Sequence, residues 1–240
     1  MLAYTKPKIV LLDDDRSLLD VVHYYLNEKF QAEVKVEAFS KSYDFISYIE
    51  ENCYLPETPT EILGSFYANP INKTEIIKTL KDLSVLPGIL VLDQELRGED
   101  VTGIDLSATI REYFPTSFIC MLTSNVPDHT AIKLHNNHNI DLFVDKKDTD
   151  AIHNLYLYLS KHIDSLKMKY PIDPIDIFGK TGNLESSLYI QNRKTLLENS
   201  NPLCFLTLNE NGDMAIMQDN YSITFWQYNP TTSQFIAYEY

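Results

Sequence analysis

The sequence predicts an α/β fold built around a parallel β-sheet. Residues Ile9 to Ser17, IVLLDDDRS, form an apolar run that ends in three carboxylates and leads directly into an amphipathic segment. A continuous apolar run of this kind is typical of a strand that helices cover on both faces. Four further strand patterns follow, each separated from the next by a helical pattern. Short connections between alternating elements require parallel strands with right-handed crossovers, so we expect a doubly wound sheet of five parallel strands.

The first half of this sheet is predicted from the residues that follow the acids. Apolar residues recur at helical spacing over residues 17–28, which predicts the first helix. Polar and apolar residues alternate over 33–37, as in a strand with one face in water, and such a strand belongs near a sheet edge. Phe45, Ile46 and Ile49 then form the apolar side of a second helix.

An irregular stretch over residues 52–87 interrupts the alternation. Prolines and a glycine punctuate it, and it contains one clear helix signature, in which Asn72 is the N-cap and Glu75 follows three residues later. We interpret the stretch as an insertion that carries its own helix.

The alternation of strands and helices resumes after the insertion. The last helix of this part has the clearest apolar stripe in the chain and ends before Pro171. Strands are predicted over 89–92, 118–122 and 140–144, and helices over about 104–111, 128–137 and 149–169.

A proline-punctuated segment over residues 171–182 is the expected boundary between two domains. The first domain is expected over residues 1–170 and includes the insertion, and a small second domain is expected over 183–240. In the second domain a helix over 184–199 precedes short strands and turns, which predicts an α+β extension with an antiparallel β-meander.

The residues of this extension are compatible with several functions. Asn211-Gly212, between two alternating apolar runs, predicts a hairpin. We interpret the extension as an interaction or dimerisation module that packs on the first domain or on a second copy. A ligand-binding β module around Trp226 and a simple extension of the first domain are the alternatives.

Composition excludes several classes of partner. The formal net charge of −14, from 34 acidic and 20 basic side chains, would repel nucleic acid and anionic membranes, and no basic patch offsets it. No apolar run approaches the roughly 18 residues of a membrane span, and MLAYTKPK lacks the apolar core of a signal peptide. The three cysteines lack the spacing of a zinc site or a disulfide framework. We expect a cytoplasmic protein that binds neither nucleic acid nor membrane.

Four predicted strands end in residues that suit one kind of chemistry: Asp13 with Asp14, then Asp93, Thr123 and Lys146. The carboxyl ends of parallel strands meet at one edge of the sheet, where ligands bind in open α/β folds. Clustered carboxylates need a cation, and an all-oxygen set favours Mg²⁺. A metal, a lysine and a hydroxyl together match the oxygens of a transferring phosphoryl group, and an aspartate can be its acceptor.

These residues resemble the receiver domain of two-component response regulators over about residues 7–165. The loop DQELRGEDVTGIDL is similar to the phosphoacceptor loop of that family. The resemblance implies a flavodoxin-like sheet with strand order 2-1-3-4-5. It also implies that Asp93 accepts the phosphoryl group and that Asp13, Asp14, Asp93 and the main-chain carbonyl of Glu95 hold Mg²⁺.

The resemblance further implies a switch. Thr123 would bind a phosphoryl oxygen, Lys146 would pair with the phosphate, and Phe143 would be the aromatic residue that turns inward when the threonine moves. The insertion and the C-terminal extension are atypical of the family. Arg97 stands where proline is common, and Lys147 follows Lys146 in place of another common proline, so Lys147 is a second candidate for the lysine role.

Two functions from different classes are compatible with this pattern. The first is a signalling switch and not an enzyme: it takes a phosphoryl group from a sensor histidine kinase or phosphotransfer protein and changes a protein-protein or homodimer interface. The alternative is a Mg²⁺-dependent phosphohydrolase of the haloacid dehalogenase type with Asp13 as nucleophile, because Asp13 to Ser17 satisfy its D-x-D-x-[ST] signature. Such a hydrolase carries an acid pair after a further strand beyond the lysine, whereas here a long helix is predicted. A receiver that binds partners without phosphorylation is a third possibility.

Overall fold

The computed structural model describes residues 3–52, 59–84, 88–114, 117–124, 139–167, 178 and 182–238. The chain divides into two compact units. The parallel unit consists of Pro7–Pro56 and Val85–Leu166, and the antiparallel unit consists of Met1–Lys6, Glu57–Ser84 and Lys167–Tyr240. Each unit is built from segments that are far apart in the sequence.

The parallel unit contains a five-stranded sheet with the order β3-β2-β4-β5-β6, in which every neighbouring pair is parallel. Numbered within this unit, the order is the expected 2-1-3-4-5, so the predicted fold class is confirmed. The strands are β2 (Lys8–Leu12), β3 (Lys35–Phe39), β4 (Ile89–Leu92), β5 (Phe118–Thr123) and β6 (Leu142–Asp145).

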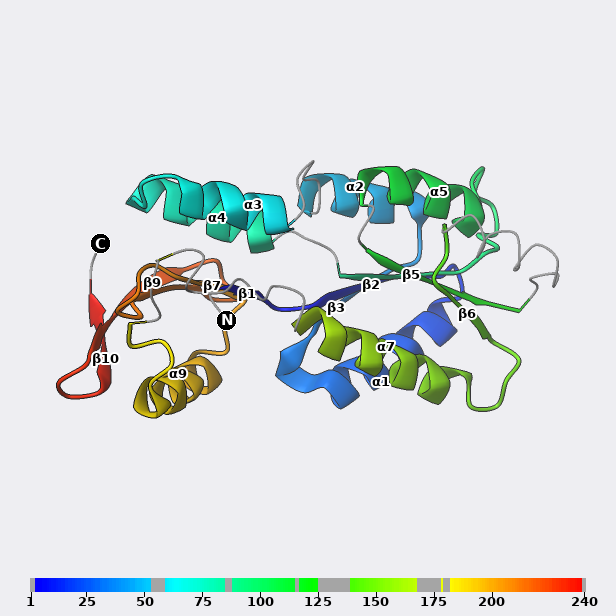
Figure 1. Cartoon of the computed structure of the whole chain (residues 1–240). Coiled ribbons are helices and arrows are strands. Elements are labelled where there is room, and N and C mark those ends of the chain that lie inside the picture. The colour runs from blue at the N-terminus through cyan, green and yellow to red at the C-terminus, as the bar shows by residue number, and fades with distance from the viewer. Residues whose placement is uncertain are drawn as a thin grey trace. The chain divides into compact units, whose positions relative to one another are not determined.

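Helices cover both faces of this sheet (Figure 1). Alternation along β2 explains why both faces are apolar, because Ile9 and Leu11 lie in one hydrophobic cluster and Val10 and Leu12 lie in the other. The first cluster includes residues of α1 and α7, and the second includes residues of α2 and α5. These helices are α1 (Arg16–Phe30), α2 (Ser42–Asn52), α5 (Gly103–Tyr113) and α7 (Ala151–Lys167). The helix expected over 128–137 lies outside the described residues.

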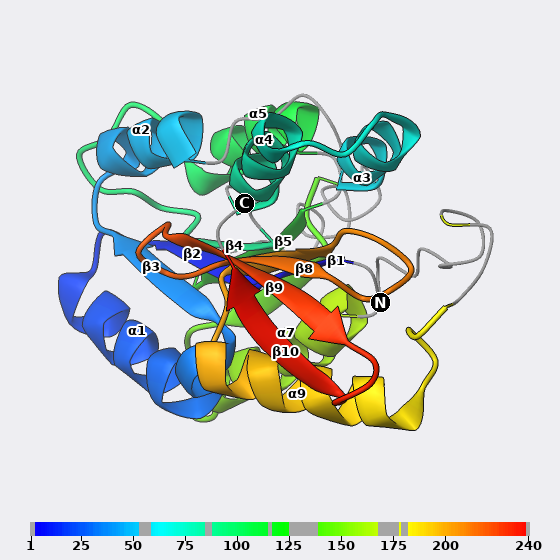
Figure 2. The ribbon, with the colours of Figure 1, turned by 90° about the vertical axis from the view of Figure 1, so that its left-hand side faces the viewer.

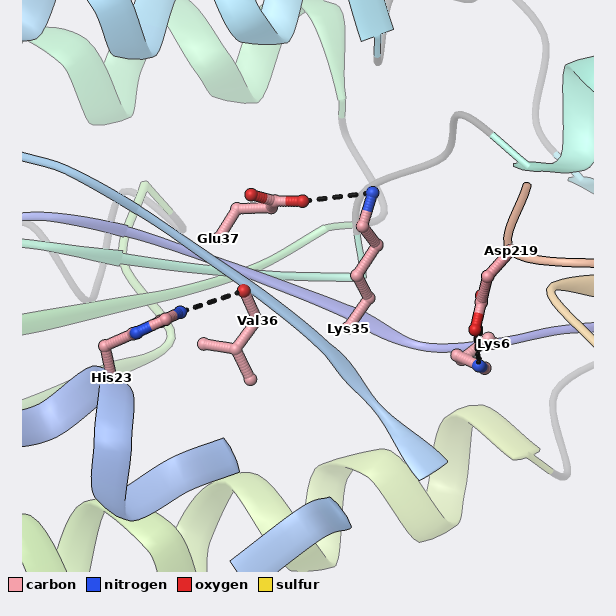
Figure 3. A network of polar contacts seen from close by, with 6 residues as sticks. All are labelled: Lys6, His23, Lys35, Val36, Glu37 and Asp219. Atoms are coloured by element: carbon pink, nitrogen blue, oxygen red, sulfur yellow. Dashed lines mark hydrogen bonds and ion pairs between the residues drawn. The ribbon is translucent and has the colours of Figure 1, made fainter. Parts of the chain in front are cut away.

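Strand β3 lies at the edge of the sheet, as its alternating sequence predicted. It begins at Lys35 and not at residue 33, because Gln31–Glu33 form a short 3-10 helix. Figure 3 shows how the strand is used: Lys35 Nζ pairs with Glu37 at 3.0 Å, and His23 Nε2 of α1 donates to the Val36 carbonyl at 3.2 Å. The ion pair accounts for the polar residues of this strand.

The antiparallel unit contains a second five-stranded sheet, with the order β1-β7-β8-β9-β10. Helix α9 (Ser187–Ser200) lies on one side of it, and α3 (Pro59–Ala68) and α4 (Lys73–Ser84) lie on the other (Figures 1 and 2). The strands are β1 (Ala3–Thr5), β7 (Cys204–Thr207), β8 (Met214–Met217), β9 (Ile223–Asn229) and β10 (Gln234–Tyr238).

The composition of this unit differs from the expected division of the chain. The expected second domain was residues 183–240 alone, whereas the antiparallel unit also takes strand β1 and the two helices of the insertion. All residues of β7 and β8 are buried, so both faces of these strands need cover. In the described part of the C-terminal segment α9 provides one layer of this cover, and the insertion supplies the other layer. Distant segments therefore complete the small C-terminal meander.

Specific contacts tie the distant segments to the C-terminal strands. The Cys204 thiol donates to the Leu80 carbonyl of α4 at 3.3 Å, and the Tyr67 hydroxyl of α3 donates to the Thr207 carbonyl at 2.9 Å. Next to β1, the nearly fully buried Lys6 pairs with Asp219 at 3.0 Å (Figure 3). These contacts fix the layers of the antiparallel unit.

The described residues of the insertion form two helices, of which the sequence predicted one. The Asn72 cap is confirmed, since its Oδ1 accepts from the Glu75 amide at 3.1 Å. Helix α3 was missed because Pro59 and Gly64 were interpreted as breaks. Pro59 is instead the first helical residue, where a proline is tolerated, and Gly64 is an exposed helix position. Among the described residues, no helix combines the length and the apolar character needed to cross a membrane.

Leu80→Ala tests whether the insertion belongs to the antiparallel unit. Leu80 is completely buried, so its truncation should destabilise that unit by about 2–5 kcal/mol. Trp226 of β9 is the single tryptophan of the chain, so its fluorescence during urea unfolding reports on this unit. The exposed neighbour Lys81 provides the control variant Lys81→Ala, which should leave the midpoint nearly unchanged. An unaltered Trp226 transition in Leu80→Ala would contradict the assignment.

Candidate functional site

Three aspartates gather at the carboxyl ends of β2 and β4. Asp13 and Asp14 directly follow β2, and Asp93 directly follows β4. Backbone hydrogen bonds continue the sheet into both loops: the Asp93 amide donates to the Leu12 carbonyl at 2.8 Å, and the Asp13 amide donates to the Phe39 carbonyl at 3.2 Å. The site is therefore held by central strands of the parallel sheet.

The three carboxylates are close enough to share one ion. One oxygen from each of Asp13, Asp14 and Asp93 lies within 4.8 Å of the others. Asp13 and Asp93 are buried, with exposed fractions of 5% and 7%, and Asp14 is half-buried. Carboxylate oxygens with one solvent-facing side are the donors that Mg²⁺ prefers, because this ion keeps several of its waters. The residues present thus fit a magnesium ion.

Lys146 is the cation that the protein itself brings to these carboxylates. Its Nζ lies 2.7 Å from Asp13 Oδ2 and 2.7 Å from Asp93 Oδ2. Its amide donates to the Thr123 carbonyl at 3.0 Å, which anchors the loop after β6 to the end of β5. Lys147, the other candidate, is exposed, and its amide donates to Asp145 Oδ1 at 2.8 Å. Of the two lysines, Lys146 is the one in contact with the acids.

Burial and charge oppose each other at this site. Burial raises the pKa of Asp13, the Lys146 ammonium lowers it, the Asp93 charge raises it again, and the net result is a raised pKa. Burial alone would lower the pKa of Lys146, but its hydrogen bonds to Asp13 and Asp93 outweigh that effect and raise it. Lys146 therefore stays charged, and the cluster favours additional positive charge.

The two predicted switch residues occupy one face of neighbouring strands. Thr123 ends β5 and Phe143 lies in β6, and Met121 of β5 is the register partner of Phe143. Because side chains alternate along a strand, Thr123 and Phe143 project from the same face. Thr123 is only 5% exposed, and Phe143 packs against the cluster that includes Met121. The spatial relation that a threonine-aromatic switch needs is present, while the switching itself remains a prediction.

Asp15, the third acid of the run, has a structural role. Its Oδ1 accepts from the amides of Ser17 at 3.0 Å and Leu18 at 3.2 Å, so it caps α1. Its own amide donates to Asp13 Oδ1 at 3.0 Å, which helps to orient the buried carboxylate. The cap therefore links the start of α1 to the acidic cluster.

Gly103 allows the loop after β4 to close. Its amide donates to the Gln94 carbonyl at 3.0 Å, and a Cβ placed at this position would lie 1.9 Å from the Asp93 carbonyl oxygen. Only a residue without a side chain permits this approach. The next helix then begins at once, with Thr102 and Asp105 forming a capping box.

Asp14, Asp15 and Asp93 line a pocket of about 720 Å³. Its lining includes predicted residues, among them Glu95, whose main-chain carbonyl remains a proposed ligand. It also includes polar residues that the sequence interpretation had not assigned to the site: Arg16, Ser40, Lys41, Arg97 and Ser124. A signal for two of them was visible, because Arg16 directly follows the acidic run and Arg97 replaces a common proline.

Comparison with known proteins identifies the fold. Neither a protein-family model nor a curated protein matches the sequence. The structure is similar to that of the response regulator LqsR from Legionella pneumophila, at 15% sequence identity and a TM-score of 0.52, over 94% of this chain and 66% of that chain. Since nearly the whole chain is aligned, the similarity is not confined to the parallel unit.

Further similar structures cover about two thirds of this chain. One is the response regulator DrrB from Thermotoga maritima, with 20% identity, 68% of this chain and 55% of that chain covered, and a TM-score of 0.44. Another is a response regulator receiver domain protein from Clostridium thermocellum, with 17% identity and a TM-score of 0.45, where the alignment covers 68% of this chain and 98% of that chain. From the sheet order and the similarity to LqsR, the parallel unit has the fold of a response regulator receiver domain, as the sequence resemblance implied.

Gly103→Ala tests the close approach in the loop after β4. The added methyl group should push the Asp93 backbone out of place and destabilise the parallel unit by about 1–3 kcal/mol. Hydrogen exchange should then be faster at the Asp93 amide, which bonds to Leu12. In Gly64→Ala the methyl group meets nothing within 4 Å, so this control should be neutral or stabilising. Equal exchange in Gly103→Ala and the unchanged protein would contradict the steric argument.

Proposed function

We propose that the protein is a response regulator that accepts a phosphoryl group on Asp93. The observation that carries the proposal is the position of Lys146, which lines a polar pocket and whose Nζ lies 2.7 Å from both Asp13 and Asp93. A phosphoryl group bound to Asp93 would bring oxygens next to this ammonium. The lysine could then exchange its carboxylate partner for the phosphate.

The donor in this proposal is a phosphohistidine of a sensor histidine kinase or a phosphotransfer protein. Asp93 attacks the phosphorus, the bond from phosphorus to the imidazole nitrogen breaks, and the nitrogen keeps the electron pair. Asp13, Asp14, Asp93 and the Glu95 carbonyl would hold Mg²⁺, which supplies charge neutralisation for the phosphoryl oxygens when bound. A receiver assists its own transfer and is not an enzyme with an external turnover reaction.

The new charge on Asp93 is the signal. Thr123 would move to bind a phosphoryl oxygen, and Phe143, on the same face, would turn inward to fill the space. The output is a changed protein-protein or homodimer interface, with the antiparallel unit as the interaction module. We place the protein in the cytoplasm, which fits the buried free thiols of Cys120 and Cys204.

The phosphohydrolase alternative is less well supported by the geometry. Its D-x-D signature would require the Asp15 carboxylate to act on the reacting group. Asp15 lines the pocket, but its Oδ1 accepts the capping hydrogen bonds of α1. Its acid pair would follow a further parallel strand after Lys146. In the described part of the chain, β6 is followed by α7, then by α9 and the strands of the antiparallel sheet.

Phosphorylation with a small donor distinguishes the two functions. With Mg²⁺ and phosphoramidate, the protein should gain one acid-stable, hydroxylamine-labile phosphate, detected by intact mass and placed on Asp93 by peptide mapping. Asp93→Asn should abolish the label because the nucleophile is lost. The control Asp15→Asn should retain it, since asparagine caps a helix as well as aspartate does. A label that maps to Asp13 and survives Asp93→Asn would establish the hydrolase instead.

Mg²⁺ binding provides a second test, which is independent of transfer. Asp13→Asn removes one of three clustered carboxylates, so the dissociation constant for Mg²⁺ should rise by on the order of tenfold or more. Isothermal titration calorimetry measures this constant directly. Asp15→Asn again serves as the matched control, and equal losses of affinity in both variants would contradict the proposed ligand set.

A further inference from the structure

The pocket above Asp93 carries two cationic side chains that the core reaction does not require. Four cations line it: Lys146, Lys41, Arg16 and Arg97. Lys146 is held by Asp13 and Asp93, and Lys41 Nζ lies 3.5 Å from Glu99 Oε1. Arg16 and Arg97 form no ion pair with any residue in the described ranges. Both are exposed, whereas Asp93 is buried, so the arginines line the outer part of the pocket.

Arg16 occupies a position that disfavours a cation. It is the first residue of α1, whose first turn contains no acidic residue. The amino-terminal end of a helix carries a partial positive charge, so a carboxylate stabilises it and a cation does not. Helix formation therefore does not explain the guanidinium, while its place in the pocket lining does.

Arg97 likewise has no evident conformational role. The Glu99 amide donates to the Leu96 carbonyl at 3.2 Å, and Gly98 has a φ of 76°, so Leu96 to Glu99 form a type II turn with Arg97 at its second position. Proline is the residue that best pre-organises that position. An arginine there gives up this advantage and adds a charge to the pocket.

The side chain of Glu99 holds in place the turn that carries Arg97. Its Oε2 accepts from the Ser42 hydroxyl at 2.6 Å, and its Oε1 lies near Lys41. The Ser42 hydrogen bond, followed by the Lys41 charge, lowers the pKa of Glu99, so this carboxylate stays ionised. The bond ties the loop after β4 to the start of α2 and thereby holds Arg97 beside the pocket.

We propose that Arg16 and Arg97 form a subsite for an anionic leaving group, so that Asp93 accepts a phosphoryl group from acyl phosphates in addition to the phosphohistidine donor, whose imidazole leaves as a neutral group. This inference rests on the proposed phosphorylation of Asp93. In an in-line transfer the leaving group lies opposite the attacking Asp93 oxygen, which is the outer side of the pocket. The acyl phosphate loses its bond between phosphorus and the acyl oxygen, Asp93 gains the bond to phosphorus, and a carboxylate departs with the electron pair. Two guanidinium groups stabilise that developing charge.

A pair of donors tests this selectivity. Acetyl phosphate releases acetate, which is an anion, whereas phosphoramidate releases ammonia, so only the first should depend on the arginines. Arg16→Gln and Arg97→Gln should each slow labelling by acetyl phosphate about fivefold, the effect of one charge a few ångströms from a unit charge in water. The rate of labelling by phosphoramidate should stay within about twofold of its value in the unchanged protein. The measured quantity is therefore the rate of labelling by acetyl phosphate divided by the rate of labelling by phosphoramidate.

Control variants distinguish an effect of the subsite from an effect of net charge and from an effect on the fold of the loop. Lys29→Gln removes one exposed positive charge from the other end of α1 and should leave the ratio unchanged. Arg97→Pro preserves the turn without the charge and should behave as Arg97→Gln does. Added salt should lower the ratio for the unchanged protein and have less effect on the double variant, because exposed charges are screened.

The outcomes are distinguishable. Equal slowing with both donors, or no change in the ratio, would overturn the subsite and leave Asp93 phosphorylation intact. Labelling of the unchanged protein by phosphoramidate but not by acetyl phosphate would also overturn it. Failure of both donors to label Asp93 would overturn the proposed function and the subsite together.

Discussion

The contact on which the parallel unit depends is the ammonium of Lys146 between the carboxylates of Asp13 and Asp93. Loss of water on burial raises the pKa of Asp13, and the charge of Asp93 raises it further, so ionising this carboxylate is costly. A single lysine at 2.7 Å from each makes the arrangement tolerable. The same cluster fits a divalent cation, so one arrangement of charges serves both the stability of the site and the phosphoryl transfer that we propose.

The sheet determines that these groups can meet at all. Each arrives at the carboxyl end of its own strand, and the parallel register aligns those ends to one edge. The loops then need special geometry, which Gly103 and the Asp15 cap provide. The positions of the acidic side chains thus depend on neighbouring residues whose role is to shape the backbone.

The antiparallel unit illustrates a different constraint. Its central strands are buried on both faces, and the described part of the C-terminal segment covers one of these faces with α9. On one side Leu196 and Leu197 of α9 pack against Phe205 and Ile216, and on the other the insertion supplies α3 and α4. A segment that interrupts the receiver pattern therefore serves the unit that completes the chain. The N-terminal strand β1 joins the same sheet through β7.

The sequence by itself determined the parallel fold and the main acids of the candidate site. Apolar runs that end in Asp13, Asp93 and Thr123 are typical of strands that are buried on both faces. In a parallel sheet the carboxyl ends of such strands lie at the same edge, so these residues are expected to be close together. It could not determine which sheet the insertion covers, that Ala3–Thr5 forms an edge strand, or that Arg16 and Arg97 share a pocket. Local patterns show that a face is buried or a side chain charged. Only the tertiary structure decides which distant segment lies against that face or which charges line the same pocket, because such contacts have no periodicity along the chain.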